Sequence, residues 1–371
     1  MEISPFLLER FFAQYEFSAR YLLSSSDCDG LPMEELLSWA DDEARGLWNG
    51  LQLGYTESQG HPVLLREIAG LYAGVDPAEV IEFVPEEAIF AAMNCLVGPG
   101  DHVVVAYPAY QSLYQIAEAS LAEVDHWLPR EEDGWRFDPE DLAGLVRPTT
   151  RLIVVNFPHN PTGAMPSREE FLRVVEIARE AGAHLFCDEM YRFLEQDPGD
   201  RLPSGPEVYD QAVALFGMSK TYGLAGLRLG WLVTHDEGLR VKLQSYKDWL
   251  TICGSAPSEI LAIIGLRNHE RIVSLHLARI GRNLDALDGF MAAHGDVFTW
   301  KRPRAGSIGL AGLLGEETAT GFALRAVRDA DIMLAPSSVF GFGERHIRIG
   351  FGRENLPQVL EVFDAFLRRG R

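Results

Sequence analysis

Apolar positions along the middle of the chain alternate between two patterns. From about residue 60, short apolar runs that predict buried strands alternate with stretches of helical spacing. The predicted strands cover residues 102–106, 151–156, 183–187, 213–218 and 229–233, and helices are predicted at 62–72, at 85–97, from about 109 and from 168. Strands that alternate with crossover helices predict an α/β fold with a doubly wound, mostly parallel sheet.

The helix from residue 168 is the best marked of these elements. Ser167 and Glu170 form the pattern of a capping box, and Gly182 stands where a helix commonly ends. The sequence therefore sets both ends of this crossover.

The pattern changes after Gly254. Amphipathic helices extend to about residue 294, and short strands follow at 307–313, 332–335 and 346–351, with a last helix from Pro357. These elements predict a smaller α+β domain. The first forty residues have helical spacing at 5–22 and no strand pattern. We expect an N-terminal segment (1–40) packed on the small domain (266–371), with a large domain at 41–265.

Composition excludes several classes of protein. The chain has 371 residues, 47% of them hydrophobic, and a net charge of -21, which repels phosphate backbones and anionic lipids. We therefore expect no nucleic-acid or membrane partner. No apolar run approaches the roughly 18 residues of a membrane helix. The first basic residue is Arg10, so no basic signal-peptide region is legible and a cytoplasmic location is expected.

Cysteine and lysine are both scarce. The cysteines form no CxxC pair and no histidine cluster has metal-ligand spacing, so we interpret Cys28, Cys95, Cys187 and Cys253 as buried thiols and expect no metal. Chemistry that needs an amine has only four candidates, Lys220, Lys242, Lys247 and Lys301.

Polar side chains follow the predicted strands in a coherent set. They are an aromatic ring, an amide, a carboxylate, a phenol and an amine, at Tyr110, Asn160, Asp188, Tyr191 and Lys220. Ligands of open α/β sheets bind beyond the carboxyl ends of the strands, so these groups are expected to meet. A planar pyridine aldehyde suits them, because the amine forms a Schiff base, the carboxylate keeps the ring nitrogen protonated, and the amide and phenol bond the ring hydroxyl.

Four motifs occur in a recognisable order. They are Asn-Pro-Thr-Gly at 160–163, Asp188 to Tyr191, Ser-Lys-Thr-Tyr-Gly-Leu-Ala-Gly-Leu-Arg-Leu-Gly-Trp at 219–231, and Ile-Arg-Ile-Gly-Phe at 347–351. With them the chain resembles the class I and II aminotransferases of the pyridoxal phosphate-dependent fold-type I superfamily, from about residue 55 to 351. The 13-residue motif around Lys220 is the most specific.

The resemblance implies a role for each ring-binding residue. Lys220 is the Schiff-base lysine for pyridoxal 5'-phosphate, and Asp188 pairs with the pyridinium nitrogen. Asn160 and Tyr191 bond the ring oxygen, and Tyr110 stacks on the ring face.

The resemblance also implies how phosphate and substrate are held. Arg228 and Ser219 bind the cofactor phosphate, and Arg348 clamps the substrate α-carboxylate near Asn160, a planar task suited to guanidinium. Tyr55 is expected to reach across a homodimer to the phosphate in the partner's site.

Two departures from the family pattern fall in the phosphate cup. The chain has Val84-Pro85-Glu86 where a glycine-containing turn is usual, and Gly217 where serine or threonine is common. A helix start still offers N–H groups to an anion, but Pro85 lacks one and Glu86 adds negative charge to the cofactor site. We therefore expect phosphate binding to depend on Arg228, Ser219 and Tyr55. The segment 24–30 also differs from the usual substrate loop, which leaves the substrate open.

The expected activity is transfer of an amino group between an L-amino acid and a 2-oxo acid, with the freed Lys220 moving a proton. The alternative is a lyase or cyclase, because the same fold serves both and because residues 156–161 and 248–251 are similar to capreomycidine synthase. A cofactor-sensing regulator is disfavoured, since only a short lead precedes residue 55. His159 is expected to be structural rather than a base.

Overall fold

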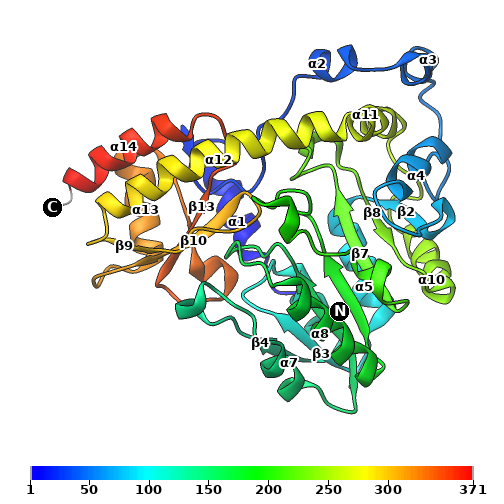
Figure 1. Cartoon of the computed structure of the whole chain (residues 1–371), viewed down its shortest axis with the longest axis horizontal. Coiled ribbons are helices and arrows are strands. Elements are labelled where there is room, and N and C mark those ends of the chain that lie inside the picture. Colours follow the sequence, from blue (N-terminus) through cyan, green and yellow to red (C-terminus); the bar gives the residue numbers. More distant parts are fainter. Residues whose placement is uncertain (1, 370–371) are drawn as a thin grey trace.

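The computed structural model describes residues 2–369 (Figure 1). A seven-stranded sheet organises the large domain, with β8 antiparallel to β2 and β7 and every other neighbouring pair parallel. In spatial order the strands are β2 (Val80–Phe83), β8 (Gly230–Val233), β7 (Ala212–Gly217), β6 (His184–Asp188), β5 (Thr150–Asn156), β3 (His102–Ala106) and β4 (Glu123–Trp127). The doubly wound, mostly parallel sheet predicted from the sequence is confirmed.

Helices cover both faces of this sheet, so the strands are buried on both sides. Val103 and Val105 of β3 pack toward α5 (Pro85–Leu96) and α6 (Ser112–Ala119), while Val104 faces the opposite core. That opposite core includes α7 (Pro139–Leu145), α8 (Arg168–Ala181) and α9 (Gly205–Val208). Farther along the same face lie α2 (Met33–Ser38), α3 (Asp42–Asn49), α4 (Pro62–Ala69) and α11 (Ala256–Arg267).

The helix α8 has the ends that the sequence predicts. Ser167 and Glu170 form the capping box, and Gly182 takes the left-handed conformation with φ 63°. The predicted cores at Trp127 and Trp135 are also present, since both indoles are buried.

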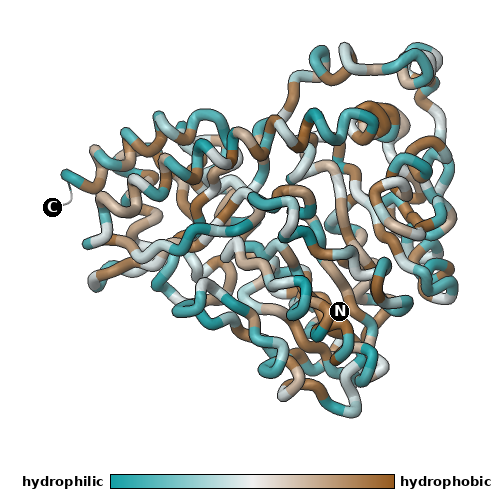
Figure 2. Tube along the Cα trace, viewed as in Figure 1, coloured by the Kyte–Doolittle hydropathy of each residue, from teal (hydrophilic) through white to brown (hydrophobic). Residues whose placement is uncertain are grey.

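The small domain contains an antiparallel sheet in the order β12-β13-β10-β9. Its strands are β9 (Phe298–Trp300), β10 (Ile308–Leu313), β12 (Ala335–Pro336) and β13 (His346–Gly350), and its helices are α12 (His269–Ala293), α13 (Ala319–Ala330) and α14 (Leu356–Arg369). Along α12 and α14 teal and brown segments alternate in Figure 2, as expected for helices with one face on a core. Within residues 2–369, no helix has the length and apolar character needed to span a bilayer.

The N-terminal segment lies along the small domain. After α1 (Leu7–Tyr15), the strand β1 (Tyr21–Leu22) pairs in parallel with β11 (Ile332–Met333). The expectation of no strand in the first forty residues is therefore wrong, because two residues are too few to produce a recognisable alternation. The Gly350 N–H donates to the Leu23 carbonyl at 2.7 Å, so the segment also follows β13.

Two other parts of the sequence-based description need correction. The sequence pattern does not predict the strands β2, β4 and β9, and β4 has mostly half-buried or exposed residues that give no apolar run. Of the four cysteines, Cys28 and Cys187 are buried, but Cys95 and Cys253 are only partly so. Cys95 lies in the last turn of α5 and Cys253 in the loop after α10 (Glu237–Lys247), and both positions are near the surface.

A buried ion pair joins α10 to the edge strand β2. Lys247 Nζ lies 2.7 Å from Glu82 Oε2, and both side chains are almost fully inaccessible to solvent. Each charge is stable there because the other compensates it. One of the four lysines is thus committed to the fold.

Candidate active site

A cavity of about 770 Å³ lies beyond the carboxyl ends of the strands, bounded by the N-terminal segment and β13. Nine of the ten residues predicted for the site line it: Glu86, Tyr110, Asn160, Asp188, Tyr191, Ser219, Lys220, Arg228 and Arg348. The tenth, Tyr55, is 92% exposed and does not line the cavity of its own chain. The fold therefore brings together groups that lie up to 262 positions apart in the sequence.

Asp188 is the last residue of β6 and projects into the cavity from the strand end. Its Oδ1 accepts from the Met190 N–H at 3.1 Å, and its carbonyl accepts from Asn156 Nδ2 at 2.9 Å. Burial raises the pKa of the carboxyl to about 7, and Lys220 opposes this shift. The site thus holds a carboxyl whose pKa lies close to neutral pH. A protonated ring nitrogen beside it would stabilise its charged form.

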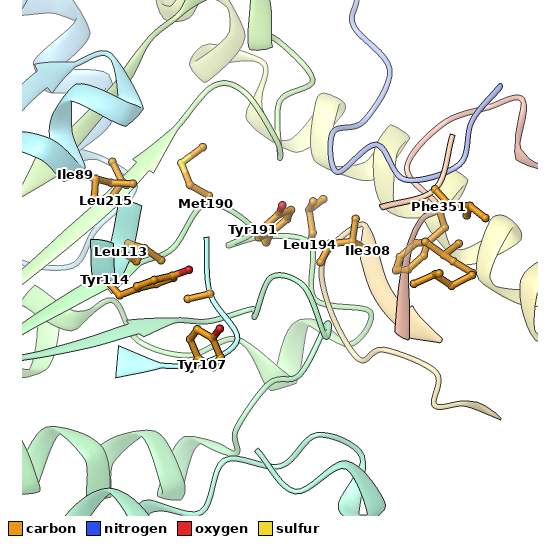
Figure 3. Packing of buried hydrophobic residues seen from close by; sticks show 14 of the residues in the cluster. Ile89, Tyr107, Leu113, Tyr114, Met190, Tyr191, Leu194, Leu215, Ile308 and Phe351 are labelled. Carbon is orange, nitrogen blue, oxygen red and sulfur yellow. The ribbon is translucent and has the colours of Figure 1, made fainter. Parts of the chain in front are cut away.

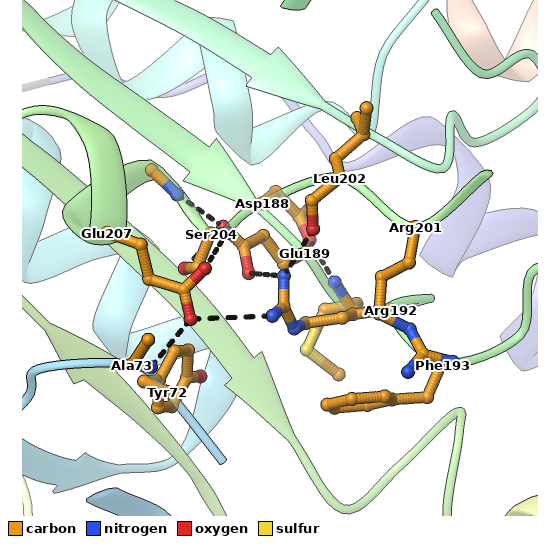
Figure 4. Close-up of polar contacts among 12 residues, drawn as sticks. Tyr72, Ala73, Asp188, Glu189, Arg192, Phe193, Arg201, Leu202, Ser204 and Glu207 are labelled. Carbon is orange, nitrogen blue, oxygen red and sulfur yellow. Dashed lines mark hydrogen bonds and ion pairs between the residues drawn. The ribbon is translucent and has the colours of Figure 1, made fainter. Parts of the chain in front are cut away.

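A polar network behind Asp188 fixes the strand end (Figure 4). The neighbouring Glu189 accepts from Ser204 Oγ at 2.8 Å and from the Gly205 N–H at 2.9 Å, with Arg192 at 3.6 Å. These groups face away from the cavity. They keep the backbone at residue 188 in place through contacts that the ligand does not touch.

Hydrogen bonds connect the strand ends to Arg348, the residue expected to bind the substrate carboxylate. Asn156 Nδ2 bonds the Asp188 carbonyl, while Asn156 Oδ1 accepts from the Asn160 N–H at 2.7 Å. Asn160 Oδ1 in turn accepts from Arg348 Nη1 at 3.1 Å. Sequence reasoning missed Asn156 as a positioning residue, although an amide that ends a buried strand is the signal that could have identified it.

Lys220 follows β7 in the turn of the 13-residue motif. Its Nζ donates to Ser26 Oγ at 2.8 Å, a contact between residues 194 positions apart. Burial lowers the pKa of the amine, while Asp27 acts in the opposite direction. The chain therefore presents an amine with an increased neutral fraction, as a nucleophile and proton acceptor requires. Ser26 belongs to the atypical N-terminal loop and was not predicted as a contact.

Two tyrosines line the cavity, and they differ in whether the hydroxyl makes a hydrogen bond. Tyr110 Oη donates to Glu9 Oε1 at 2.9 Å, and its ring packs 4.8 Å from that of Phe6. Tyr191 is buried beside Met190 and Leu194, with Ile308 of the small domain nearby (Figure 3). Its Oη has no hydrogen-bond partner among the described residues, so this buried donor is available for a ligand oxygen.

Arg348 is a buried cation without a carboxylate. The residue is 1% exposed, and Nη2 donates to the Ser24 carbonyl at 2.8 Å. Within residues 2–369 no carboxylate lies within 4 Å of it, and its Nε lacks a partner. A desolvated guanidinium in this state favours an anionic ligand, and its planar fork suits a carboxylate.

The two departures in the phosphate cup have a common packing reason. The Pro85 ring begins α5 and packs on Gly217 and Gly230, which pair across β7 and β8. A Cβ on Gly217 would lie 2.9 Å from the Gly230 Cα, and one on Gly230 would lie 2.9 Å from the Pro85 Cγ. The close contact that admits the proline ring therefore excludes a hydroxyl-bearing side chain at residue 217.

The anion donors of the cup are the start of α5 and Arg228. No side chain caps α5, so its first-turn N–H groups are available. Arg228 has a left-handed backbone with φ 51°, and its Nη1 donates to the Ala225 carbonyl at 3.0 Å. Against them stands Glu86, whose pKa burial raises to about 7, so that carboxyl is close to half protonated at neutral pH.

His159 does not line the cavity. It is buried, its Nδ1 lies 2.7 Å from Thr162 Oγ1, and its ring packs edge-on to Phe137. Burial lowers the pKa of the imidazole to about 3, so it is neutral at physiological pH.

The residues present fit pyridoxal phosphate. The cavity offers an amine of lowered pKa, a carboxyl for the ring nitrogen, an unpartnered phenol for the ring oxygen, and a cation with a helix start for the phosphate. The carboxyl of Glu86 opposes the phosphate.

Comparison with known proteins gives consistent results. Residues 21–363 match the family described as aminotransferase class I and II. A PLP-dependent aminotransferase from Streptococcus suis 89-1591 superposes with a TM-score of 0.93 at 31% identity, over 100% of this chain and 99% of its own. Capreomycidine synthase from Streptomyces vinaceus is 32% identical over 266 residues, 71% of this chain and 67% of that protein.

A second structure, a PLP-dependent cyclase named OrfR, has a TM-score of 0.90 at 28% identity, over 100% of this chain and 99% of its own. The similar proteins thus include an aminotransferase and a cyclase of the same fold, and a synthase that is similar in sequence. The family match covers most of the chain, and the structural similarity agrees with it. The chain therefore belongs to the class I and II aminotransferase family, whose cofactor is pyridoxal 5'-phosphate.

Proposed function

We propose that the protein is an aminotransferase that moves an amino group between an L-amino acid and a 2-oxo acid, with Lys220 as the Schiff-base residue. The observation that carries the proposal is the buried, unpaired Arg348 in the same cavity as the Lys220 amine and the Asp188 carboxyl. Pyridoxal phosphate, when bound, supplies an aldehyde that condenses with amines and a ring that withdraws electrons from the bonds at Cα.

The residues divide the work by position. Arg348 binds the substrate carboxylate and so orients the Cα–H bond toward Lys220, whose neutral Nζ accepts the proton from Cα and returns it to the cofactor side. Asp188 holds the ring nitrogen in its protonated form, and Tyr191 and Asn160 bond the ring oxygen.

A half-reaction tests this proposal. Holoenzyme mixed with a pool of L-amino acids is expected to lose its visible absorbance as the pyridoxamine form accumulates, and to regain it when 2-oxo acids are added. Lys220→Ala is the control that binds ligands without the amine. If the absorbance does not respond to any amino acid, the proposal is wrong.

A lyase or cyclase is the second candidate, favoured by the similarity to capreomycidine synthase and the OrfR cyclase. Such an enzyme consumes its amino acid without an oxo-acid acceptor. Release of ammonia or water in a single incubation, with no pyridoxamine form, would support this candidate and contradict transamination.

We also propose a homodimer in which Tyr55 reaches the partner's phosphate site. Tyr55 and the nearby Leu53 are almost fully exposed, an unusual state for large apolar side chains. Light scattering is expected to give twice the 41.3 kDa chain mass. A monomeric mass for the wild-type protein, with the same cofactor affinity in the wild type and in Tyr55→Ala, would contradict this proposal.

A further inference from the structure

One wall of the cavity is acidic and comes from the N-terminal segment. Phe6, Glu9, Phe12 and Glu16 follow one another at helical spacing along α1 and its C-terminal cap, and all four line the cavity. Asp27, from the segment after β1, lines it as well. Leu8, Arg10 and Phe17 of the same segment line the cavity too, so this wall contributes three carboxylates and one guanidinium and has a net negative charge.

The helix that carries this wall is fixed to the rest of the protein. The Leu7 N–H donates to Gln111 Oε1 at 2.8 Å, and Gln111 Nε2 donates to the Pro5 carbonyl at 3.1 Å. Leu8 is buried in a small core with Phe340, and Tyr110 Oη bonds Glu9. The wall is therefore a built part of the site rather than a passing surface contact.

The negative charge of the wall is incompletely compensated. Asp27 pairs with Arg353 at 3.1 Å, and Glu9 accepts from an uncharged hydroxyl. Glu16 has no cation within 4 Å in the described part of the chain. Its pKa is raised by burial and then by the nearby Asp27 and Glu9, whereas Arg353 and Lys220 act in the opposite direction without cancelling the rise.

Arg348, beside this wall, provides a second and independent observation. Arg348 is buried and lines the same cavity, with its Nε unpartnered and no carboxylate nearby. Its guanidinium carbon lies 5.6 Å from the ring centre of Phe12, which is one helical turn from both Glu9 and Glu16. The acidic wall therefore lies beside the position expected for a substrate carboxylate on Arg348.

We propose that the substrate is an amino acid whose side chain ends in a cation, a guanidinium or an ammonium, recognised by Glu9 and Glu16 between the rings of Phe6 and Phe12. Carboxylates give the cation charged hydrogen bonds, and the aromatic faces give it a further favourable surface. This inference rests on the proposed reaction of an amino acid at Lys220.

Pairs of amino acids that differ only in charge test the inference. L-Arginine is compared with L-citrulline, and L-lysine with L-norleucine, by kcat/KM of the holoenzyme half-reaction and by calorimetric affinity for Lys220→Ala, which does not need turnover. We expect the cationic member of one pair to be preferred by about tenfold or more, the value of one hydrogen bond between charged groups.

Three variants locate the preference. Glu9→Gln with Glu16→Gln is expected to bring each pair close to parity by lowering the values for the cation while those for the neutral partner change little. Glu16→Gln alone, which leaves the bond from Tyr110 to Glu9 intact, is expected to give part of this loss. Glu361→Gln on the exposed face of α14 is the matched control, with no change.

The outcomes separate the two proposals. If amino acids react but neither pair shows a preference for charge, the inference is wrong and the proposed function stands. If calorimetry shows the preference while no amino acid reacts, the proposed function is wrong and recognition of the cation stands. A preference that persists in the double variant contradicts the assignment to Glu9 and Glu16.

Discussion

The carboxyl of Glu86 in the phosphate cup makes cofactor affinity dependent on pH. Its pKa is raised to about 7, so the proton is bound below that pH and lost above it. The groups that face it are Glu9, Asp188, Arg228 and Ser112, and only Arg228 favours the ionised form through its charge. A phosphate with a charge of about -1.5 to -2 at pH 7 favours the protonated carboxyl.

The size of the effect follows from this single titration. If phosphate binds beside protonated Glu86 only, the dissociation constant of the wild type relative to Glu86→Gln grows by a factor of about 1.1 at pH 6, about 2 at pH 7 and about 11 at pH 8. Asp188 also titrates near neutrality and raises the pKa of Glu86, so the ratio reports the removal of Glu86 together with its effect on Asp188.

The assay is a titration of apoprotein with pyridoxal phosphate at the three pH values, followed by absorbance. Pyridoxal, which lacks the phosphate, is the ligand control and is expected to give a flat ratio. Glu87→Gln is the protein control, because Glu87 lies on the same helical turn but bonds Thr251 Oγ1 at 2.9 Å and does not line the cavity. A constant ratio between pH 6 and pH 8 would refute the reasoning.

Three other substitutions have definite expectations. Arg228→Ala is expected to weaken pyridoxal phosphate binding by about tenfold or more in equilibrium dialysis, because it removes the cation that faces Glu86 at the start of α5; near-wild-type retention would contradict this. Asp188→Asn is expected to slow the half-reaction by about a hundredfold or more, since an amide does not stabilise a protonated ring nitrogen, and an unchanged rate would exclude that role. Gly350→Ala is expected to lower the melting temperature by several degrees, because a Cβ there would overlap the backbone carbonyl of Ser25; an unchanged midpoint in calorimetry would show that the segment moves without cost.

The sequence was most informative where the determinants are local. The strands that end at Asn156 and Asp188 and the turn that carries Lys220 are short buried runs followed by polar residues, so both the sheet and the set of converging side chains could be predicted. The two-residue strand β1 was not predictable, because its stability comes from pairing with β11 more than three hundred positions away.

The missed parts of the site have the same origin. Ser26 contacts Lys220 across 194 positions, and Glu9 reaches Tyr110 across 101. Neither residue has a neighbouring motif, and a glutamate in an amphipathic helix is ordinarily solvent-exposed. Only the folded arrangement shows that α1 turns its carboxylates toward the cavity.

The ion pair between Lys247 and Glu82 has a consequence for chemical labelling. Of the four lysines, Lys242 and Lys301 are exposed and do not line the cavity, and Lys247 is buried in its contact with Glu82 and does not line it either. Lys220 is thus the one amine of the described chain that combines access to the cavity with a lowered pKa. Borohydride reduction of the holoenzyme followed by peptide mass mapping should therefore mark a single peptide, the one that contains Lys220. With four lysines in the chain, few other peptides could carry the label.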